Sequence, residues 1–203
     1  MGFFDRQSQE LEKRGLDPAR LPPGQYFTER FPVLHAGVVP DIEVATWDFT
    51  VDGLVGQEHR WSLEEFKALP AVDLTTDIHC VTKWSKFDTE WRGVPTIEIA
   101  NLVEPSPAAT HVVVRAEHGF TANLPLEDFL REGNLFAYEF GGEELDLDHG
   151  WPVRLVVPHL YFWKSVKWTR GFTLLDHDEP GFWERNGYHM YGDPFQEQRY
   201  WGD

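Results

Sequence analysis

The chain has 203 residues, 41% of them hydrophobic and 15% aromatic, so it can bury one sizeable core, and we expect one domain with extensions. Thirty-four acidic residues against 18 basic ones give a formal net charge of −16, which argues against partners such as nucleic acid or an anionic membrane surface. The single cysteine excludes an intramolecular disulfide, and the sequence shows neither a secretory signal nor a run of transmembrane length, so we expect a cytoplasmic protein.

The first part of the chain is predicted to be an arm. Residues 1–26 form this N-terminal arm, and residues 27–203 form the single domain. Within the arm, residues 7–14 are polar and permit a helix, which the prolines from Pro18 onward bring to an end. Residues 27–42 are interrupted by further prolines and are predicted to be extended.

Strands and short helices alternate along the rest of the chain. Residues 47–55 alternate as a strand, and Asp52-Gly53 is typical of a hairpin. A capping box at residues 62–65 begins a short helix that Pro70 ends. We predict further strands at 72–78, 111–116, 134–140, 153–157 and 166–175, further short helices at 97–103 and 124–131, and a turn at 91–95. Together these elements predict a mixed α+β domain that is rich in sheet.

A basic island interrupts this acidic chain. Residues 154–175 contain no aspartate or glutamate. The cations of the island are Arg154, Lys164, Lys167 and Arg170. They alternate with apolar residues, which indicates that they emerge from buried strands into a deep phosphate pocket, because arginine and lysine donate charge-assisted hydrogen bonds to phosphate. The alternative is a strand with a solvated basic face.

The lone cysteine, Cys80, follows the strand predicted at 72–78. His79 precedes it, and Lys83 and Lys86 follow it, so that nearby cations would favour a thiolate. The usual fate of a free cysteine is that of a small buried hydrophobe, and the residue types alone favour this. A nucleophile with a histidine base and a single soft ligand to a redox metal are the other possibilities. Zinc is disfavoured, since the histidines show no ligand spacing.

Two long segments resemble a known family. HCVTKWSKFDTEWRGVP at 79–95 and HGWPVRLVVPHLYFWKSVKW at 149–168 resemble the molybdenum-binding domain of the sulfite oxidase family, particularly its small bacterial stand-alone members. The chain is also similar to the catalytic subunit of the bacterial periplasmic methionine-sulfoxide reductase. The resemblance extends from about residue 27 to the C-terminus. It implies the sulfite oxidase-type fold and, as cofactor, molybdopterin with molybdenum.

The resemblance implies roles for individual residues at the cofactor. Cys80 matches the cysteine whose thiolate ligates molybdenum. His149 and Arg154, spaced as in the family's H-G-x-P-V-R, match contacts to the pterin and its phosphate. The tripeptide that closes on the cofactor is Ser165, Val166 and Lys167, with Lys167 on the phosphate side. Residues 116–118 correspond to another pterin contact, for which His118 is our candidate.

Other matches concern the substrate and the first cofactor loop. Tyr188, in the segment FWERNGY, falls at the position of the active-site tyrosine and would orient a substrate oxygen; its alternative role is packing in an aromatic tail. Arg30, in FTERFPV, falls in the family's first cofactor-contact loop. Sulfite oxidases follow the metal cysteine with a substrate-binding arginine, whereas residues 81–85 here offer only Lys83. This departure puts sulfite as the substrate in doubt.

These residues predict a molybdopterin-dependent oxidoreductase. It would transfer an oxygen atom, with two electrons, to or from a small oxyanion or a sulfoxide. The sequence has no haem motif, so another protein or acceptor must exchange the electrons, and the acidic chain would suit a basic partner. One alternative is a non-catalytic pterin- or anion-binding module of the same fold. Another is a cysteine-dependent hydrolase in which Cys80 approaches His149 or His159.

Overall fold

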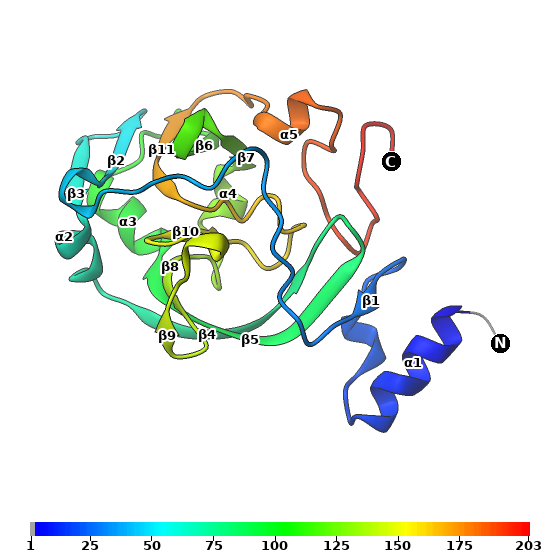
Figure 1. Ribbon diagram of the computed structural model, residues 1–203. Coiled ribbons are helices and arrows are strands. Elements are labelled where there is room, and N and C mark those ends of the chain that lie inside the picture. The colour runs from blue at the N-terminus through cyan, green and yellow to red at the C-terminus, as the bar shows by residue number, and fades with distance from the viewer. Residues whose placement is uncertain (1–2) are drawn as a thin grey trace.

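Two mixed β-sheets and short helices make up the structure (Figure 1), a computed structural model that describes residues 3–203. The helices are α1 (Phe3–Lys13), α2 (Leu63–Lys67), α3 (Thr96–Val103), α4 (Leu126–Phe129) and α5 (Phe182–Arg185). The strands are β1 (Tyr26–Phe27), β2 (Asp48–Gly53), β3 (His59–Ser62), β4 (Val72–His79), β5 (Trp84–Pro95), β6 (His111–Ala116), β7 (Thr121–Pro125), β8 (Leu135–Phe140), β9 (Glu143–Glu144), β10 (Arg154–Val156) and β11 (Thr169–Leu175). The predicted α+β class, rich in sheet, is confirmed.

The sheets combine antiparallel neighbours with one parallel pair each. The first sheet has the order β1-β5-β8-β10, with β4 also pairing with β5 and β9 with β8. The second sheet has the order β3-β2-β11-β6-β7. The pairs β1–β5 and β2–β11 are parallel. Because β1 lies near the start of the domain and β11 near its end, each sheet joins strands that are far apart in the sequence.

An aromatic core lies between the two sheets. Phe136 of β8 stacks on Phe172 of β11 with ring centroids 6.1 Å apart, and Phe49 of β2 meets Phe136 edge-on at 4.8 Å. All three side chains have no exposed surface, and such rings contribute both buried area and directional packing. A second buried cluster includes Ile78, Trp84 and Trp91 of the β4–β5 hairpin together with Cys80. It supports the loop that carries the cysteine.

Three of the predicted elements differ from the observed ones. The turn predicted at residues 91–95 was wrong, because these residues end the long strand β5. Trp91 and Val94 are buried there, and a Cβ on Gly93 would lie 2.2 Å from the Phe136 carbonyl oxygen, so glycine permits the close approach of β8. The helix predicted at 124–131 is only the short α4, because its first residues belong to β7, which pairs with β6. The last predicted strand, 166–175, begins only at Thr169.

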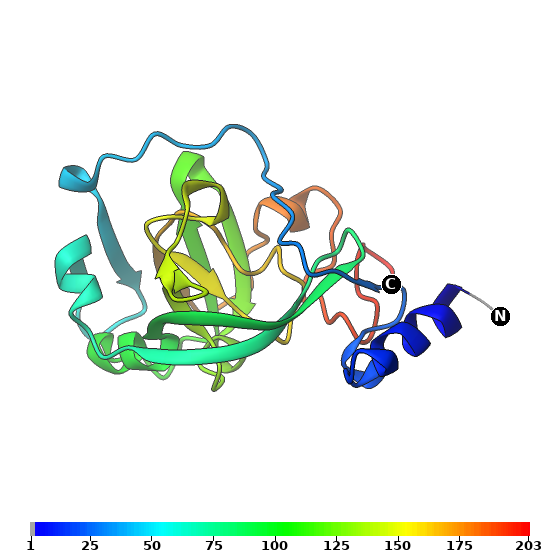
Figure 2. The same cartoon turned by 60° about the horizontal axis from the view of Figure 1, so that its bottom comes forward.

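Two segments wrap around the sheets. Residues 28–43, which we call the strap, run without regular secondary structure from β1 across the molecule to β2, and Figures 1 and 2 show this segment arching over one face. Residues 186–203, the tail, return beside the β4–β5 hairpin, and Tyr188 and Tyr200 form a bridge within it. Among the described residues, no helix is long and apolar enough to span a membrane.

The division of the chain at residue 26 stays a prediction. α1 lies apart from the sheets in both views, in agreement with an arm, while β1 at the end of this stretch pairs with β5. Residues 1 and 2 of the predicted arm lie outside the described residues.

Candidate functional site

A cavity of about 350 Å³ opens between the strap, the loop after β4, and the segments around residues 117, 165 and 183. The strap closes one side of it through Phe31, Leu34 and His35. The segment that follows β10 and the helix α5 form other walls. Of the residues predicted for the site, the cavity lining includes Cys80, His118, His149, Arg154, Ser165, Val166, Lys167 and Tyr188. The fold therefore gathers residues that are more than 100 positions apart in sequence.

Cys80 begins a tight turn that connects β4 to β5. Its backbone N–H donates to the Trp84 carbonyl at 2.8 Å, and the Lys83 N–H donates back to the Cys80 carbonyl at 2.9 Å. Cys80 is 8% exposed, and its thiol receives a hydrogen bond from the Thr82 hydroxyl at 3.1 Å. Burial raises its pKa, while the Thr82 hydrogen bond and the charges of Arg199 and Lys167 oppose that rise. A bound metal ion would supply the missing stabilisation of the thiolate.

The cations next to Cys80 in sequence do not face the sulfur. Lys83 is exposed and does not line the cavity, and Lys86 donates its ammonium hydrogen to the Glu29 carbonyl at 2.7 Å. Lys83 has a φ of +79°, so its backbone adopts a turn conformation and not the extended conformation of a strand residue. The prediction that these two lysines favour the Cys80 thiolate is therefore wrong. Arg199 and Lys167, which are distant in sequence, supply positive charge instead.

Arg154 is the most buried cation of the cavity. It is 1% exposed, and its guanidinium donates to the carbonyls of His149 at 2.7 Å and Ser165 at 2.8 Å. The ring of Phe162 lies 4.3 Å from the guanidinium carbon. Among the described residues, no carboxylate forms an ion pair with it, and burial lowers its pKa to about 9. A dry guanidinium without a counter-ion is costly, so this arrangement points to an anion bound in the cavity.

Lys167 places a second charge beside Arg154. Its ammonium donates to the Asp148 carbonyl at 2.6 Å and lies 3.2 Å from His35 Nδ1 on the strap. Burial and the charge of Arg154 lower the pKa of Lys167 to about 7. Gly150, with a φ of +118°, makes this proximity possible, because a Cβ there would lie 3.0 Å from the Arg154 Cβ and 3.2 Å from the Lys167 Cβ.

His149 and Ser165 order the same end of the cavity. His149 Nδ1 lies 2.7 Å from an Asp146 carboxylate oxygen, and Nε2 lies 3.2 Å from the Phe31 carbonyl oxygen. Both partners are hydrogen-bond acceptors, and together they fix the orientation of the ring. Its ring stacks on Phe31 at 4.0 Å and so attaches the strap. The Ser165 hydroxyl accepts a hydrogen bond from the Val157 N–H at 2.9 Å, which fixes the segment that carries Val166 and Lys167.

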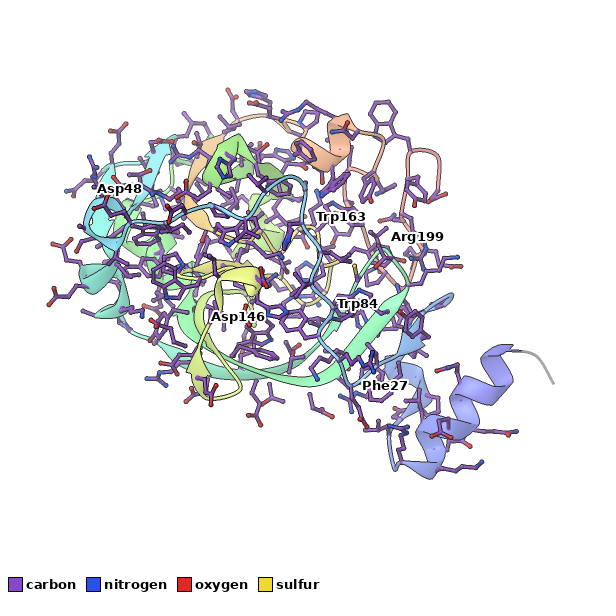
Figure 3. All side chains as sticks on the ribbon, in the orientation of Figure 1. Phe27, Asp48, Trp84, Asp146, Trp163 and Arg199 are labelled. Carbon is purple, nitrogen blue, oxygen red and sulfur yellow. The ribbon has the colours of Figure 1, made fainter. Side chains whose placement is uncertain are left out.

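Aromatic rings form the wall near Cys80. Tyr188 stacks on Trp183 with ring centroids 4.8 Å apart and meets Trp163 edge-on at 5.0 Å. Trp163, labelled in Figure 3, donates its indole hydrogen to Glu184 at 2.8 Å. Burial raises the pKa of Tyr188, and Tyr200 and Cys80 add to the rise, so its hydroxyl stays a hydrogen-bond donor at neutral pH. This end of the cavity is apolar with a single phenolic donor.

Only some of the cations of the basic island line the cavity. Arg154 and Lys167 face the cavity as expected, whereas Lys164 forms a buried ion pair with Glu184 at 2.7 Å. Arg170 pairs with Asp48 at 2.5 Å and Glu117 at 2.9 Å and does not line the cavity. The anion-site interpretation therefore holds for two of its four cations.

Two candidates stand apart from the cavity, and one lies at its edge. Arg30 is exposed and is absent from the lining, as is Lys83. His118 lines the cavity, but it is exposed and has a φ of 57° in a one-turn helix after β6. The hydrolase alternative gains no geometric support, because the Cys80 sulfur receives its hydrogen bond from Thr82 and His159 is paired with Asp128 at 3.0 Å.

Several contributors were missed from the sequence. Phe31 and His35 come from a proline-interrupted segment without any periodic pattern, and Arg199 comes from an aromatic tail. Phe31 lies in FTERFPV, which resembles the family's first cofactor-contact loop, but only Arg30 was named there; His35 and Arg199 belong to no motif with a characteristic spacing. They reach the site because the strap and the tail wrap back onto it.

The cavity suits an anionic cofactor that brings its own metal ligands. A soft thiol lies in an apolar wall, and Arg154, Lys167 and His149 lie together on another wall. Within residues 3–203, no group of three or more His, Cys, Asp or Glu could hold a metal ion. A metal at Cys80 would thus need its remaining ligands from the cofactor, and the uncompensated cations fit a phosphate.

Comparisons with known proteins agree with this chemistry. The family described as "Oxidoreductase molybdopterin binding domain" matches residues 35–183. The chain is 51% identical to an uncharacterized oxidoreductase, YuiH, of Bacillus subtilis, over 91% of this chain and 93% of that protein. It is 30% identical to the protein-methionine-sulfoxide reductase catalytic subunit MsrP of Gluconobacter oxydans, over 72% of this chain and 52% of that protein.

More distant similarities cover only part of the other chains. A mitochondrial sulfite oxidase of Drosophila melanogaster is 27% identical over 84% of this chain and 35% of its own. The crystal structure of the sulfane dehydrogenase SoxCD from Paracoccus pantotrophus superposes with a TM-score of 0.63 at 19% identity, over 69% of this chain and 41% of that one. This last similarity concerns the fold alone.

Proposed function

The chain belongs to the family of oxidoreductase molybdopterin-binding domains, and from this premise we propose that its cavity holds molybdopterin with molybdenum for oxygen-atom transfer on a sulfite- or sulfoxide-type substrate. The observation that carries the proposal is the shared cavity of a lone buried thiol, Cys80, and a buried arginine without a counter-ion, Arg154. When bound, the cofactor supplies a metal that exchanges two electrons and an oxygen atom with the substrate.

The residues of this chain bind and orient that group. Cys80 provides a thiolate ligand, which its buried turn directs into the cavity. Arg154 and Lys167 hold the phosphate, and His149 lies beside them, where its contacts with Asp146 and Phe31 attach the strap. Ser165 and Val166 line the cavity on the same segment as Lys167, and the Ser165 hydroxyl fixes this segment through the Val157 N–H. His118 at the cavity edge is the candidate for a further pterin contact, whereas the exposed Arg30 receives no support from its position.

The end of the cavity that contains Tyr188 favours a neutral substrate that gives up or takes up an oxygen atom. Tyr188 can donate its hydroxyl hydrogen to a substrate oxygen, since its raised pKa keeps the proton on. Trp163 and Trp183 exclude water around it. Lys83 faces away from the cavity, so no cation from the turn after Cys80 meets a sulfite dianion there. We therefore propose a sulfoxide-type substrate in preference to sulfite.

The outward position of Lys83 also supports a second candidate function. A domain that binds the cofactor but lacks a substrate cation could serve as a non-catalytic pterin- or anion-binding module. The two candidates differ in turnover. Reduction of dimethyl sulfoxide or of methionine sulfoxide with a dye as electron donor supports the enzyme, and a full molybdenum complement without turnover on either sulfoxide or on sulfite supports the module.

Metal and pterin analysis of variants tests the cofactor site. In a host that makes molybdopterin, wild-type protein should contain about one molybdenum and one pterin per chain. Cys80→Ser should lose most of the metal, because an alcohol is a poor ligand for this metal at neutral pH, and Arg154→Met should lose metal and pterin together. Mass spectrometry of metals and fluorescence of released, oxidised pterin measure both.

The matched control is Arg170→Met, which removes a cation of the same island that is not part of the cavity lining. It should retain both components. Well-folded wild-type protein without molybdenum, from a host that loads other molybdopterin enzymes, contradicts the proposal.

A further inference from the structure

Two segments from outside the matched residues 35–183 meet behind the turn that carries Cys80. Gln25, just before β1, donates its side-chain amide hydrogen to the Cys80 carbonyl at 3.1 Å. Arg199, in the tail, donates to the Val81 carbonyl at 2.9 Å. The Tyr26 N–H donates to the Lys83 carbonyl at 2.7 Å. We call these three contacts the clasp. Figure 3 shows Arg199 on the tail beside the connection between β4 and β5.

Arg199 is placed for this turn and not for an ion pair. Its side chain is buried, at 8% exposure, and its second terminal nitrogen donates to the Pro23 carbonyl at 3.3 Å. Its guanidinium carbon lies 4.9 Å from the Tyr161 ring. Glu197, its nearest carboxylate among the described residues, is half exposed and 3.7 Å away. A buried guanidinium thus directs one donor of each terminal nitrogen to a backbone carbonyl, and the two carbonyls come from different parts of the chain.

The clasp limits how Cys80 can move. The sulfur lines the cavity, whereas the carbonyls of Cys80 and Val81 are held from behind by Gln25 and Arg199. A turn whose carbonyl oxygens are fixed cannot rotate its peptide planes freely, so the Cα–Cβ bond of Cys80 keeps one direction. Partners of this kind, one layer behind a metal ligand, set the orientation of the ligand.

We propose that Arg199, assisted by Gln25, is a positioning residue that directs the Cys80 sulfur toward the bound molybdenum. The clasp connects the N-terminal segment and the tail to the turn that carries Cys80. This inference rests on the proposed role of Cys80 as the molybdenum ligand.

The test compares Arg199→Met, Arg199→Lys and the control Arg185→Met in the full chain, purified from a host that makes molybdopterin. Arg185 is an exposed arginine of the same region whose guanidinium donates to Pro180 and Thr121, away from the clasp. Four quantities are measured: molybdenum per chain, released pterin per chain, the thiolate-to-molybdenum charge-transfer absorption, and the midpoint of thermal unfolding.

Arg199→Met should keep its pterin, since Arg154 and Lys167 are intact, while its molybdenum affinity falls about 10-fold to 100-fold and its charge-transfer band shifts or weakens. Arg199→Lys, which can still donate to one carbonyl, should recover part of both. Arg185→Met should match the wild type.

Two results for Arg199→Met overturn the inference: wild-type molybdenum content with an unshifted band, or a parallel loss of pterin and metal with a lower unfolding midpoint, as in general destabilisation. Cys80→Ser separates this failure from that of the proposed function. If Cys80→Ser loses molybdenum while Arg199→Met keeps it, only the clasp is wrong. If wild-type protein holds no molybdenum, the proposed function fails, and the inference fails with it.

Discussion

The charge of Lys167, a residue of the cavity lining, depends on pH near neutrality. Its pKa is lowered from 10.5 to about 7 by burial and by Arg154, so in the cofactor-free protein the ammonium is charged below pH 7 and largely neutral above it. An anion in the cavity favours the charged form. Anion binding above pH 7 must therefore be accompanied by proton uptake at Lys167.

The corresponding prediction concerns sulfate, whose own charge is constant between pH 6 and 8. Cofactor-free protein should bind sulfate more tightly at pH 6 than at pH 8, and the Lys167→Met variant should bind it weakly and without this pH dependence. Titration calorimetry in two buffers of different ionisation enthalpy measures both the affinity and the proton uptake. Lys86→Met, which removes a half-buried lysine outside the cavity lining, is the control, and equal wild-type affinities at the two pH values contradict the prediction.

The sequence predicted which cations lie near the cavity better than it predicted which groups they pair with. The acid-free island indicated Arg154 and Lys167, and both line the cavity. It could not separate them from Lys164, because the neutralising Glu184 comes from a helix 20 positions later. Lys83 was a candidate by proximity to Cys80, but the backbone turn directs it outward. Arg199 was missed because one arginine in a tail carries no pattern, and only the folded chain brings it to Val81.

Among the elements, α5 and the segment after β10 are joined by the buried pair of Lys164 and Glu184. The two side chains are 1% and 0% exposed. The Lys164 ammonium also donates to the Asn123 carbonyl at 2.8 Å and to the Met190 carbonyl at 2.7 Å. Burial lowers the pKa of Lys164, and Glu184 opposes the change. The pair thus connects β7, α5 and the tail around the aromatic wall.

Removal of one partner should destabilise the protein strongly. Lys164→Met leaves the Glu184 carboxylate buried and unpaired, which we expect to cost about 3–5 kcal/mol in the free energy of unfolding. The double variant Lys164→Met/Glu184→Leu should recover much of this loss. Arg92→Met, which breaks a surface pair with Asp73, is the control and should cost less than about 1 kcal/mol. Denaturant unfolding measures these values, and a Lys164→Met loss no larger than the control would refute the expectation.

The elements themselves were predicted where local patterns are complete. The strand at residues 111–116 and the capping box at 62–65 are observed, the latter with both of its reciprocal hydrogen bonds. β5 was missed altogether: no strand was predicted over residues 84–95, and Gly93 and Pro95 suggested a turn, although Gly93 serves the close approach of β8. β7 was missed because its register depends on pairing with β6, which no local pattern encodes.

For the whole molecule, the dominant property is the net charge of −16. We propose a basic electron-transfer partner on this ground, since opposite net charges accelerate association. Dithionite-reduced protein should reduce a basic c-type cytochrome more slowly as ionic strength rises. With ferricyanide, an anion, the rate should instead increase with salt, because screening removes repulsion. Stopped-flow absorbance at several salt concentrations measures both, and a cytochrome rate independent of salt contradicts the proposal.

The strap described above also has a kinetic consequence. Phe31 stacks on His149 and His35 contacts Lys167, so the segment lies across the same residues that would hold the cofactor phosphate. A cofactor beneath it could leave only after these contacts open. Its residence time would then be governed by how often the strap detaches, and the holo-protein would keep its cofactor through long dilution even where the equilibrium affinity is modest.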